Sequence, residues 1–292
     1  MPRLPEPAPL KVATLAYPVG EPRTWGAFEG KVRALVGEAA SAGAGFLVFP
    51  EYFAMESAAL WPDEVRGSLV RQLAAVQETL PAFRAMLASL ARDHAVTIVG
   101  GSYPVASGDG YRNRAYVFLP DGSEDFQDKL IMTRFENELW HIGPGDALRV
   151  FDTGAYRFGV NICYDSEFPA LARRQAEGGA VLLAIPSCTD TRAGDCRVRV
   201  GARARALENQ FYVLRSPTVG LAPWSPAIDE NTGCAAVYTP CDREFPADGV
   251  LAAGADEVPG WVYADVDLAK IAWIRRHGQV LNFNDRTKQD RF

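Results

Sequence analysis

Short apolar segments of strand length alternate with stretches of helical periodicity along the whole chain, and this alternation constrains the fold more than any other feature. Residues 11–17 are rich in β-forming side chains, and residues 22–43 repeat apolar side chains at helical spacing. Residues 45–50 then form a near-continuous apolar segment, which is typical of a strand covered on both faces. The pattern predicts an α/β fold.

The alternation continues to the end of the chain. Further strands are expected at 96–104, 114–119, 157–163, 181–187, 211–219 and 261–267, and further helices within 64–94 and at 169–177 and 197–209. Pro81 should begin a second helix within 64–94, because proline is tolerated in a first helical turn but not inside a helix. Residues 120–122 (Pro-Asp-Gly) predict a hairpin turn, and residues 220–233 an irregular loop. No linker, repeat or low-complexity tract divides residues 1–292, so we expect one domain in which two packed sheets lie between helices.

Composition excludes several classes of protein. With 48% hydrophobic and 23% charged residues the chain is of ordinary globular type, and its net charge of −6 without a basic tract argues against nucleic-acid binding. Prolines near the N-terminus do not suit a signal peptide, and the longest apolar segments fall far short of the ~20 residues that cross a bilayer. Five scattered cysteines and three histidines form no metal-binding pattern. We therefore expect a cytoplasmic protein with free thiols, without a metal and without contact with a membrane.

Three reactive side chains stand at or just beyond the ends of predicted strands. They are Glu51 in Phe-Pro-Glu-Tyr-Phe, Lys129 in Gln-Asp-Lys-Leu-Ile, and Cys163 in Asn-Ile-Cys-Tyr-Asp. Singly, each suits an ordinary role: a turn residue, a solvated lysine and a buried apolar cysteine. Together they could work as one device, in which the ammonium lowers the thiol pKa and holds an oxyanion while the carboxylate moves protons. Nothing local in the sequence shows that the three meet.

The three motifs resemble those of the nitrilase superfamily, the carbon–nitrogen hydrolases with a Glu-Lys-Cys triad. Their order and their separations, 78 residues from Glu51 to Lys129 and 34 from Lys129 to Cys163, also suit that family. The resemblance covers a core of about residues 9–275 and leaves a C-terminal tail at 276–292. It implies a four-layer αββα sandwich of two packed mixed sheets flanked by helices. It also implies a homodimer or higher homo-oligomer, and no metal or organic cofactor.

The same resemblance assigns further roles. Glu138 lies seven residues before Gly145 of a Gly-Pro-Gly-Asp turn and is expected to be the supporting carboxylate that keeps Lys129 placed, with Glu136 as a competitor two residues away. The backbone N–H of Tyr164 is expected to help hold the oxyanion. Substrate contacts are expected from Tyr52, Trp140, Glu167, Ser187 and Thr189, whereas the Cys188 thiol is expected to be a bystander.

Cys-Tyr-Asp at 163–165 resembles the amidase branch more than true nitrilases, which usually have Cys-Trp-Glu. The sequence therefore predicts a cysteine-dependent hydrolase that splits a small amide into ammonia and a carboxylic acid through a thioester. A nitrilase or N-carbamoyl hydrolase stays an alternative, as does a non-enzymatic binding or scaffold protein on the same fold. Glu167 stands where ω-amidases carry an arginine, so it either repels anionic substrates from the pocket or caps the helix that begins near Pro169.

Overall fold

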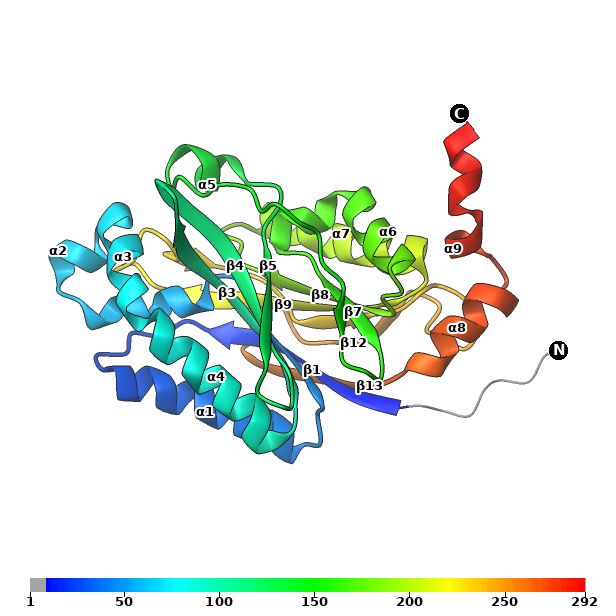
Figure 1. Ribbon diagram of the computed structural model, residues 1–292, viewed down its shortest axis with the longest axis horizontal. Coiled ribbons are helices and arrows are strands. Elements are labelled where there is room, and N and C mark those ends of the chain that lie inside the picture. The colour runs from blue at the N-terminus through cyan, green and yellow to red at the C-terminus, as the bar shows by residue number, and fades with distance from the viewer. Residues whose placement is uncertain (1–8, 292) are drawn as a thin grey trace.

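The computed structural model describes residues 9–291, whose strands form two layers enclosed by two layers of helices (Figure 1). Helices α1 (Trp25–Ser41) and α4 (Leu80–His94) cover one side of the strands. Helices α6 (Pro169–Glu177) and α7 (Arg192–Asn209) cover the other side. The predicted four-layer αββα sandwich is confirmed.

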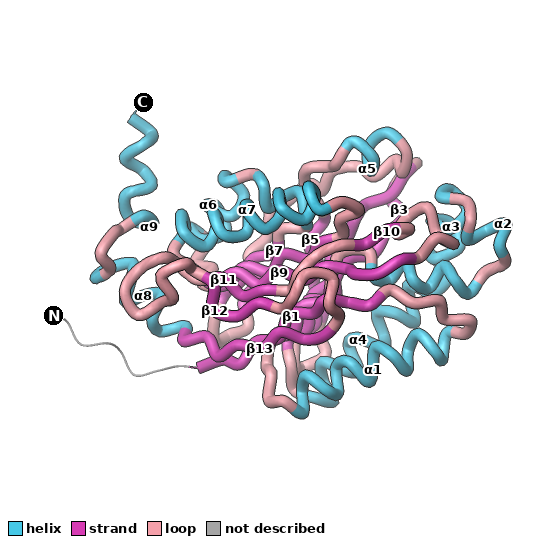
Figure 2. Tube along the Cα trace, turned by 180° about the vertical axis from the view of Figure 1, so that it is seen from behind, coloured by secondary structure: helices cyan, strands magenta, loops and turns pink. Residues whose placement is uncertain are grey.

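Each layer of strands is a mixed sheet with parallel pairing at its centre. The first sheet has the order β5 (Glu124–Asp128), β4 (Gly110–Phe118), β3 (Thr97–Ser107), β2 (Phe46–Phe49), β1 (Pro9–Pro18) and β13 (Gly260–Asp267). The second has the order β6 (Phe151–Asp152), β7 (Arg157–Val160), β8 (Leu182–Ser187), β9 (Tyr212–Leu221), β11 (Ala236–Tyr238) and β12 (Val250–Ala253), and β10 (Glu230–Asn231) pairs with the end of β9. The sheets join where Tyr17 and Pro18 pair in parallel with Thr218 and Val219. Figure 2 shows β13 beside β1 from behind.

The core explains why the segment at 45–50 is apolar throughout. Side chains alternate across a strand, so Leu47 and Phe49 pack toward α1 and α4, whereas Phe46 and Val48 pack against the second sheet. All four are fully buried, and burying such a side chain contributes about 1.5–3 kcal/mol to folding. Both faces of β2 are thereby fixed, which holds the residue that follows the strand in one position.

Several elements differ in detail from the prediction. The helical stretch at 64–94 is three helices, α2 (Asp63–Arg66), α3 (Leu69–Val76) and α4, and Pro81 lies in the first turn of α4 as expected. α7 begins five residues earlier than predicted, because Thr191 caps it by accepting a hydrogen bond from the Gly194 N–H at 3.1 Å. The sequence patterns did not predict α5 (Arg134–Glu138), α8 (Leu268–His277), α9 (Asn282–Asp285), or the 3₁₀ segments η1 (Phe53–Leu60), η2 (Gln77–Thr79), η3 (Cys163–Glu167) and η4 (Arg286–Arg291).

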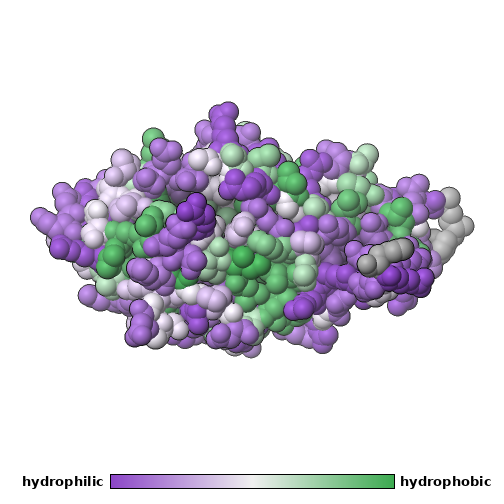
Figure 3. Space-filling model, turned by 90° about the horizontal axis from the view of Figure 1, so that it is seen from above, coloured by the Kyte–Doolittle hydropathy of each residue, from purple (hydrophilic) through white to green (hydrophobic). Residues whose placement is uncertain are grey.

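The surface mixes polar and apolar residues. Figure 3 shows one face, on which hydrophobic residues gather near the middle among hydrophilic ones. The large apolar side chains that are exposed include Val70, Phe135, Leu139, Val200, Leu207, Leu221, Val258 and Val280. Among the helices within residues 9–291, none is long and apolar enough to cross a bilayer.

Candidate active site

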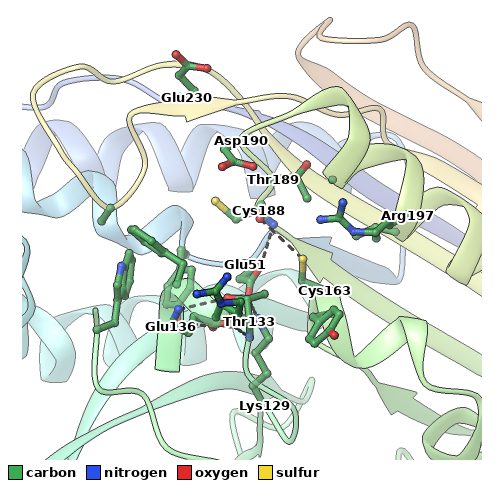
Figure 4. A pocket seen from close by; sticks show the side chains of 18 of the residues that line it. Glu51, Lys129, Thr133, Glu136, Cys163, Cys188, Thr189, Asp190, Arg197 and Glu230 are labelled. Carbon is green, nitrogen blue, oxygen red and sulfur yellow. Dashed lines mark hydrogen bonds and ion pairs between the residues drawn. The ribbon is translucent and has the colours of Figure 1, made fainter. Parts of the chain in front are cut away.

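The fold brings the three predicted reactive residues together. Glu51 directly follows the Pro50 that ends β2, Lys129 follows β5, and Cys163 begins η3 shortly after β7. All three are at most 5% exposed, and the Lys129 Nζ donates a hydrogen bond to the Glu51 Oε1 at 2.8 Å. In Figure 4, Glu51 lies between Cys163 on one side and Glu136 on the other. Residues that lie 112 positions apart in the sequence thus share one buried cluster.

Cys163 has a strained backbone. Its φ of 49° lies in the left-handed region, where a β-carbon is disfavoured, and such strain persists only where the surrounding structure enforces it. The Ser166 hydroxyl enforces it here by donating to the Cys163 carbonyl at 2.6 Å. The thiol sulfur lies 3.8 Å from the Cys188 carbonyl oxygen and lines a cavity. Cys163 therefore lies at the boundary between the core and the cavity, and it belongs to both.

The turn that carries Glu51 depends on a close approach by β3. A β-carbon on Gly101 would lie 2.1 Å from the Pro50 carbonyl oxygen, and the φ of Gly101 is +58°. Only glycine fits this position without displacing the turn. The next residue, Ser102, accepts a hydrogen bond from the Tyr52 N–H at 3.1 Å and fixes the other side of Glu51.

A second carboxylate, Glu136, completes the cluster. Its Oε2 accepts from the Lys129 Nζ at 2.6 Å and from the Thr133 N–H at 3.0 Å, and its Oε1 accepts from the Tyr52 hydroxyl at 2.9 Å. Thr133 in turn accepts from the Glu136 N–H, so the two residues form a capping box at the start of α5. Lys129 is therefore held between two carboxylates.

The prediction that Glu138 keeps Lys129 placed is wrong. Glu138 has a side chain that is 54% exposed and pairs with Arg134 at 2.8 Å on the surface. Residues two apart on a helix point in directions about 200° apart, so only one of Glu136 and Glu138 can face inward from α5. The capping box, which fixes Glu136 at the third helical position, decides which one does.

Asn113 on β4 is a member of the cluster that the sequence analysis missed. Its Nδ2 donates to the Glu51 Oε1 at 2.8 Å and to the Glu136 Oε1 at 2.9 Å, and its carbonyl accepts from the Lys129 N–H at 2.8 Å. It thereby spaces the two carboxylates around one ammonium. No motif surrounds Asn113, and only the pairing of β4 with β5 brings it to the site.

The electrostatics of the cluster follow from burial and from these contacts. Burial raises the pKa of Glu51, the Glu136 charge raises it further, and Lys129 and the Cys163 thiol oppose this rise. Burial alone would lower the pKa of Lys129, but the Glu136 and Glu51 charges raise it well above its usual value. Burial would likewise raise the pKa of Glu136, yet the Lys129 charge and hydrogen bond outweigh it and the pKa falls. Lys129 and Glu136 are thus a fixed ion pair, and Glu51 is the group whose proton affinity is raised.

The thiol behaves differently from the expectation that Lys129 would depress its pKa. Burial and then the Glu51 charge raise the pKa of Cys163 well above its usual value, and the lowering effect of Lys129 does not compensate. The raised pKa favours a neutral thiol at Cys163 beside the Glu51 carboxylate. A neutral thiol becomes a nucleophile only when a neighbouring base removes its proton.

The cavity in front of Cys163 has a volume of about 630 Å³, within the range of small-molecule sites. Tyr52, Trp140, Tyr164, Glu167 and Thr189, for which the sequence analysis predicted contacts with the substrate or the oxyanion, all line it; the contacts themselves stay predictions. Other lining residues include Thr133, Arg134, Phe135, Cys188, Asp190, Arg197, Pro226, Ala227, Asp229 and Glu230. Asp190 and Glu230 lie toward the far end from Lys129 (Figure 4).

The prediction that Ser187 contacts the substrate is wrong. Its side chain is buried, and its hydroxyl donates to the Ser216 carbonyl on the neighbouring strand at 3.2 Å. A buried hydroxyl needs such a partner, and the one available to Ser187 lies within the sheet. Cys188 lines the cavity. Its backbone N–H helps to fix the Glu51 carboxylate, because it donates a hydrogen bond to the Glu51 Oε2 at 2.9 Å.

The sequence left two roles open for Glu167, facing the pocket or capping the helix that begins near Pro169, and the capping role is wrong. The N-cap of α6 is Phe168 and no side chain caps it. Glu167 instead lines the cavity and pairs with Arg197 of α7 at 3.5 Å.

A model of the carbon-nitrogen hydrolase family matches residues 11–276. The chain belongs to this family. It is 33% identical to the probable hydrolase YhcX of Bacillus subtilis over 280 residues, which are 96% of this chain and 54% of that protein. It is also 33% identical to the omega-amidase NIT2 of Bos taurus over 201 residues, which are 65% of this chain and 68% of that one.

The fold agrees with the family assignment. The crystal structure of Saccharomyces cerevisiae Nit3, a member of branch 10 of the nitrilase superfamily, superimposes with a TM-score of 0.74 at 24% identity, with 97% of each chain covered. This likeness supports the fold, and the match of the family model to residues 11–276 confirms the predicted resemblance to the carbon–nitrogen hydrolases. The chain spans about half the length of the Bacillus relative, so it corresponds to only part of that protein.

Proposed function

We propose that this enzyme hydrolyses a small amide to ammonia and a carboxylic acid through a thioester on Cys163. The observation that carries the proposal is the arrangement of Glu51, which contacts Lys129 at 2.8 Å and whose pKa is influenced by the Cys163 thiol. A carboxylate of raised pKa beside a strained cysteine and a permanent ammonium provides a base, a nucleophile and an oxyanion partner in one cavity. Amidases among the family relatives support the same reaction class.

Acylation follows from these three roles. Glu51 removes the thiol proton while the sulfur attacks the amide carbon, and the carbonyl oxygen becomes an oxyanion. Lys129 stabilises this oxyanion together with the Tyr164 N–H, which lies in the first turn of η3, where backbone N–H groups lack partners within the helix. Glu51 then gives its proton to the amide nitrogen, the C–N bond breaks, ammonia leaves, and the acyl group stays on Cys163 as a thioester.

Deacylation reuses the same carboxylate. Glu51 removes a proton from a water molecule that attacks the thioester carbon, and Lys129 again stabilises the oxyanion. The C–S bond breaks, the carboxylic acid leaves, and Glu51 returns the proton to the sulfur. Because Glu136 and Asn113 hold Lys129 and Glu51 in place throughout, neither needs to move between the two half-reactions.

The test measures ammonia release from a panel of small amides, nitriles and ureido acids. Wild type should release ammonia fastest from amides, Cys163→Ala should release none, and the matched variant Cys188→Ala should keep most of the activity. Faster release from a nitrile or a ureido acid would favour the nitrilase or N-carbamoyl alternative. No turnover of any panel member by wild type would favour the non-enzymatic alternative.

The charges along the cavity favour a neutral or amine-bearing substrate tail. Arg197 is paired with Glu167, and Arg134 is paired with Glu138, so neither cation is left free for an anionic tail. Asp190, Asp229 and Glu230 also line the cavity, and within residues 9–291 none of these three has a cationic side chain in salt-bridge range. A carboxylate tail that lies ~4 Å from one of these acidic side chains would be repelled by about 1 kcal/mol even in water-like surroundings. That energy corresponds to a kcat/KM about fivefold lower than for a neutral tail.

The tail preference is tested with two amides of equal length, one ending in a carboxylate and one in an amine. Wild type should have the higher kcat/KM for the amine-tailed amide, and Glu167→Arg should shift the ratio toward the acid at least fivefold. A wild-type preference for the acid, or an unchanged ratio in Glu167→Arg, would remove Glu167 from substrate recognition. The predicted homo-oligomer is likewise a proposal, which analytical ultracentrifugation of wild type tests.

A further inference from the structure

Asp165 joins the segment that carries Lys129 to the turn that carries Cys163. Its carboxylate accepts from the Ile131 N–H at 2.8 Å, from the Leu130 N–H at 3.2 Å and from the Ile162 N–H at 3.3 Å. The first two groups directly follow Lys129, and the third directly precedes Cys163. Asp165 itself is 1% exposed and does not line the cavity. It touches neither the sulfur nor the space for the substrate, so it can act on the site only through the backbone groups that it binds and through its charge near Lys129.

The two segments depend on Asp165 unequally. The Cys163 turn has further supports, since the Asp165 N–H donates to the Ile162 carbonyl at 3.0 Å and Ser166 donates to the Cys163 carbonyl at 2.6 Å. The Lys129 backbone is itself paired with the Asn113 carbonyl and the Gly145 N–H, each at 2.8 Å. The Leu130 and Ile131 N–H groups that follow it both donate to the Asp165 carboxylate, which receives a single N–H, that of Ile162, from the Cys163 side. Loss of the carboxylate should therefore displace the Lys129 segment more than the Cys163 turn.

The carboxylate is retained at a cost. Burial raises the pKa of Asp165 to about 7, even though the Lys129 charge and the backbone N–H groups of Ile131, Leu130 and Ile162 lower it. A buried carboxylate that served only to fill space could be replaced by an apolar side chain. The Asp165 carboxylate instead accepts three N–H groups from two segments that are far apart in the sequence, and it thereby holds the two segments next to each other.

We infer that Asp165 is a positioning residue, which sets the Lys129 ammonium at the distance from Cys163 that oxyanion stabilisation needs. This inference rests on the proposed function. It predicts that removal of the carboxylate lowers the rate of amide turnover, which passes through an oxyanion, more than it lowers the rate at which a small reagent alkylates the thiol. It also predicts that the effect falls on kcat, because groups that bind the substrate are untouched.

The test compares Asp165→Asn, which keeps one acceptor oxygen, and Asp165→Ala, which keeps none. Expected are losses in kcat of about tenfold or more for Asp165→Asn and a larger loss for Asp165→Ala, with KM within about twofold of wild type. Alkylation of Cys163 by iodoacetamide, which builds no oxyanion, should slow by no more than about threefold in Asp165→Asn. Equal losses in turnover and alkylation would mean that Asp165 only supports the Cys163 turn, and would overturn the inference.

Asp242 provides the matched control. Its carboxylate also accepts backbone N–H groups from separate segments, those of Arg243 at 2.6 Å and Gln279 at 2.9 Å, but it does not line the catalytic cavity. Asp242→Asn should lower the melting temperature as Asp165→Asn does, yet leave kcat within about twofold of wild type. Equal falls in kcat for the two variants would show a general stability effect and overturn the inference.

Crystal structures of wild type and Asp165→Asn separate this inference from the proposed function. The Lys129 segment should shift in the variant while the Cys163 turn keeps its backbone, whether or not any amide is turned over. An unchanged Lys129 segment would overturn the inference even if amide hydrolysis is established.

Discussion

Two lysines of this molecule, the half-buried Lys31 and the buried Lys129, both pair with buried carboxylates but behave differently. Lys31 of α1 contacts one carboxylate, Glu56, at 2.7 Å, and its ammonium lies 4.1 Å from the centre of the Tyr17 ring. Lys129 contacts two carboxylates, Glu51 at 2.8 Å and Glu136 at 2.6 Å. Burial lowers the pKa of Lys31 because Glu56 offsets it only in part, whereas the pKa of Lys129 is raised despite deeper burial.

The difference lies in the number of carboxylates and in what stands beside them. At Lys31 the attraction of a single carboxylate offsets only part of the cost of desolvation, so the pKa falls. At Lys129 the second carboxylate, Glu136, secures the positive charge, and in the proposed mechanism this allows Glu51 to exchange a proton with Cys163. A buried ion pair alone therefore does not mark an active site. A shared ammonium next to a strained nucleophile and a cavity does.

The largest expected effect comes from removing each lysine in turn. Lys129→Ala should lower kcat by about 10²-fold or more, the scale for losing an oxyanion partner, since among residues 9–291 Lys129 alone brings a positive charge to Glu51 and Glu136. Lys31→Ala should leave kcat within about twofold of wild type and affect only thermal stability. Steady-state kinetics and thermal melts of both variants make the comparison, and similar kcat values for the two would abolish the distinction between the clusters.

A smaller effect is expected from the supporting carboxylate. Glu136→Gln leaves Lys129 with one charged partner, as at Lys31, and should lower kcat about tenfold or more because the ammonium loses its fixed position. Glu138→Gln is the matched control on the same helix and should keep kcat within about twofold of wild type. A larger loss for Glu138→Gln than for Glu136→Gln would restore the assignment that the spacing motif suggested.

The pH dependence is the mildest expected effect. Glu51 acts as a base only when it is deprotonated, and its pKa lies above the usual value of 4.5. The kcat/KM of wild type should therefore fall as the pH drops through an apparent pKa higher than that of an ordinary glutamate. A pH profile measured at constant ionic strength tests this, and an acidic limb centred at or below 4.5 would mean that another group controls the reaction.

The sequence predicts those parts of the site that depend on local pattern. Glu51, Lys129 and Cys163 each sit in a short motif at a strand end, so the motifs locate them without a structure. Glu136 was also within reach, because Thr133 followed three residues later by a glutamate is the pattern of a capping box. The spacing to Gly145 was a weaker signal than this physical one and selected Glu138.

Other parts could not be predicted because they depend on pairing across the sheet. Asn113 reaches the cluster through the register of β4 with β5, and Asp165 acts through backbone groups that lie 34 and 35 residues before it. The direction of the Cys163 pKa shift needs the depth of burial, which charge pairing in the sequence does not reveal. The order of layers followed from the alternation of strands and helices, whereas the 3₁₀ turn at Cys163 depends on contacts from Asp165 and Ser166.

The central claim is that Cys163 becomes acylated during turnover, although it rests as a neutral thiol. The most direct measurement mixes wild type with the best amide of the panel, quenches the reaction with acid during turnover, and maps the peptides by mass spectrometry. The account predicts that the mass of the acyl group appears on the peptide that contains Cys163 and is absent from that peptide in Lys129→Ala under the same conditions. An acyl group on Cys188, or ammonia release by wild type with Cys163 unmodified throughout, would contradict the account.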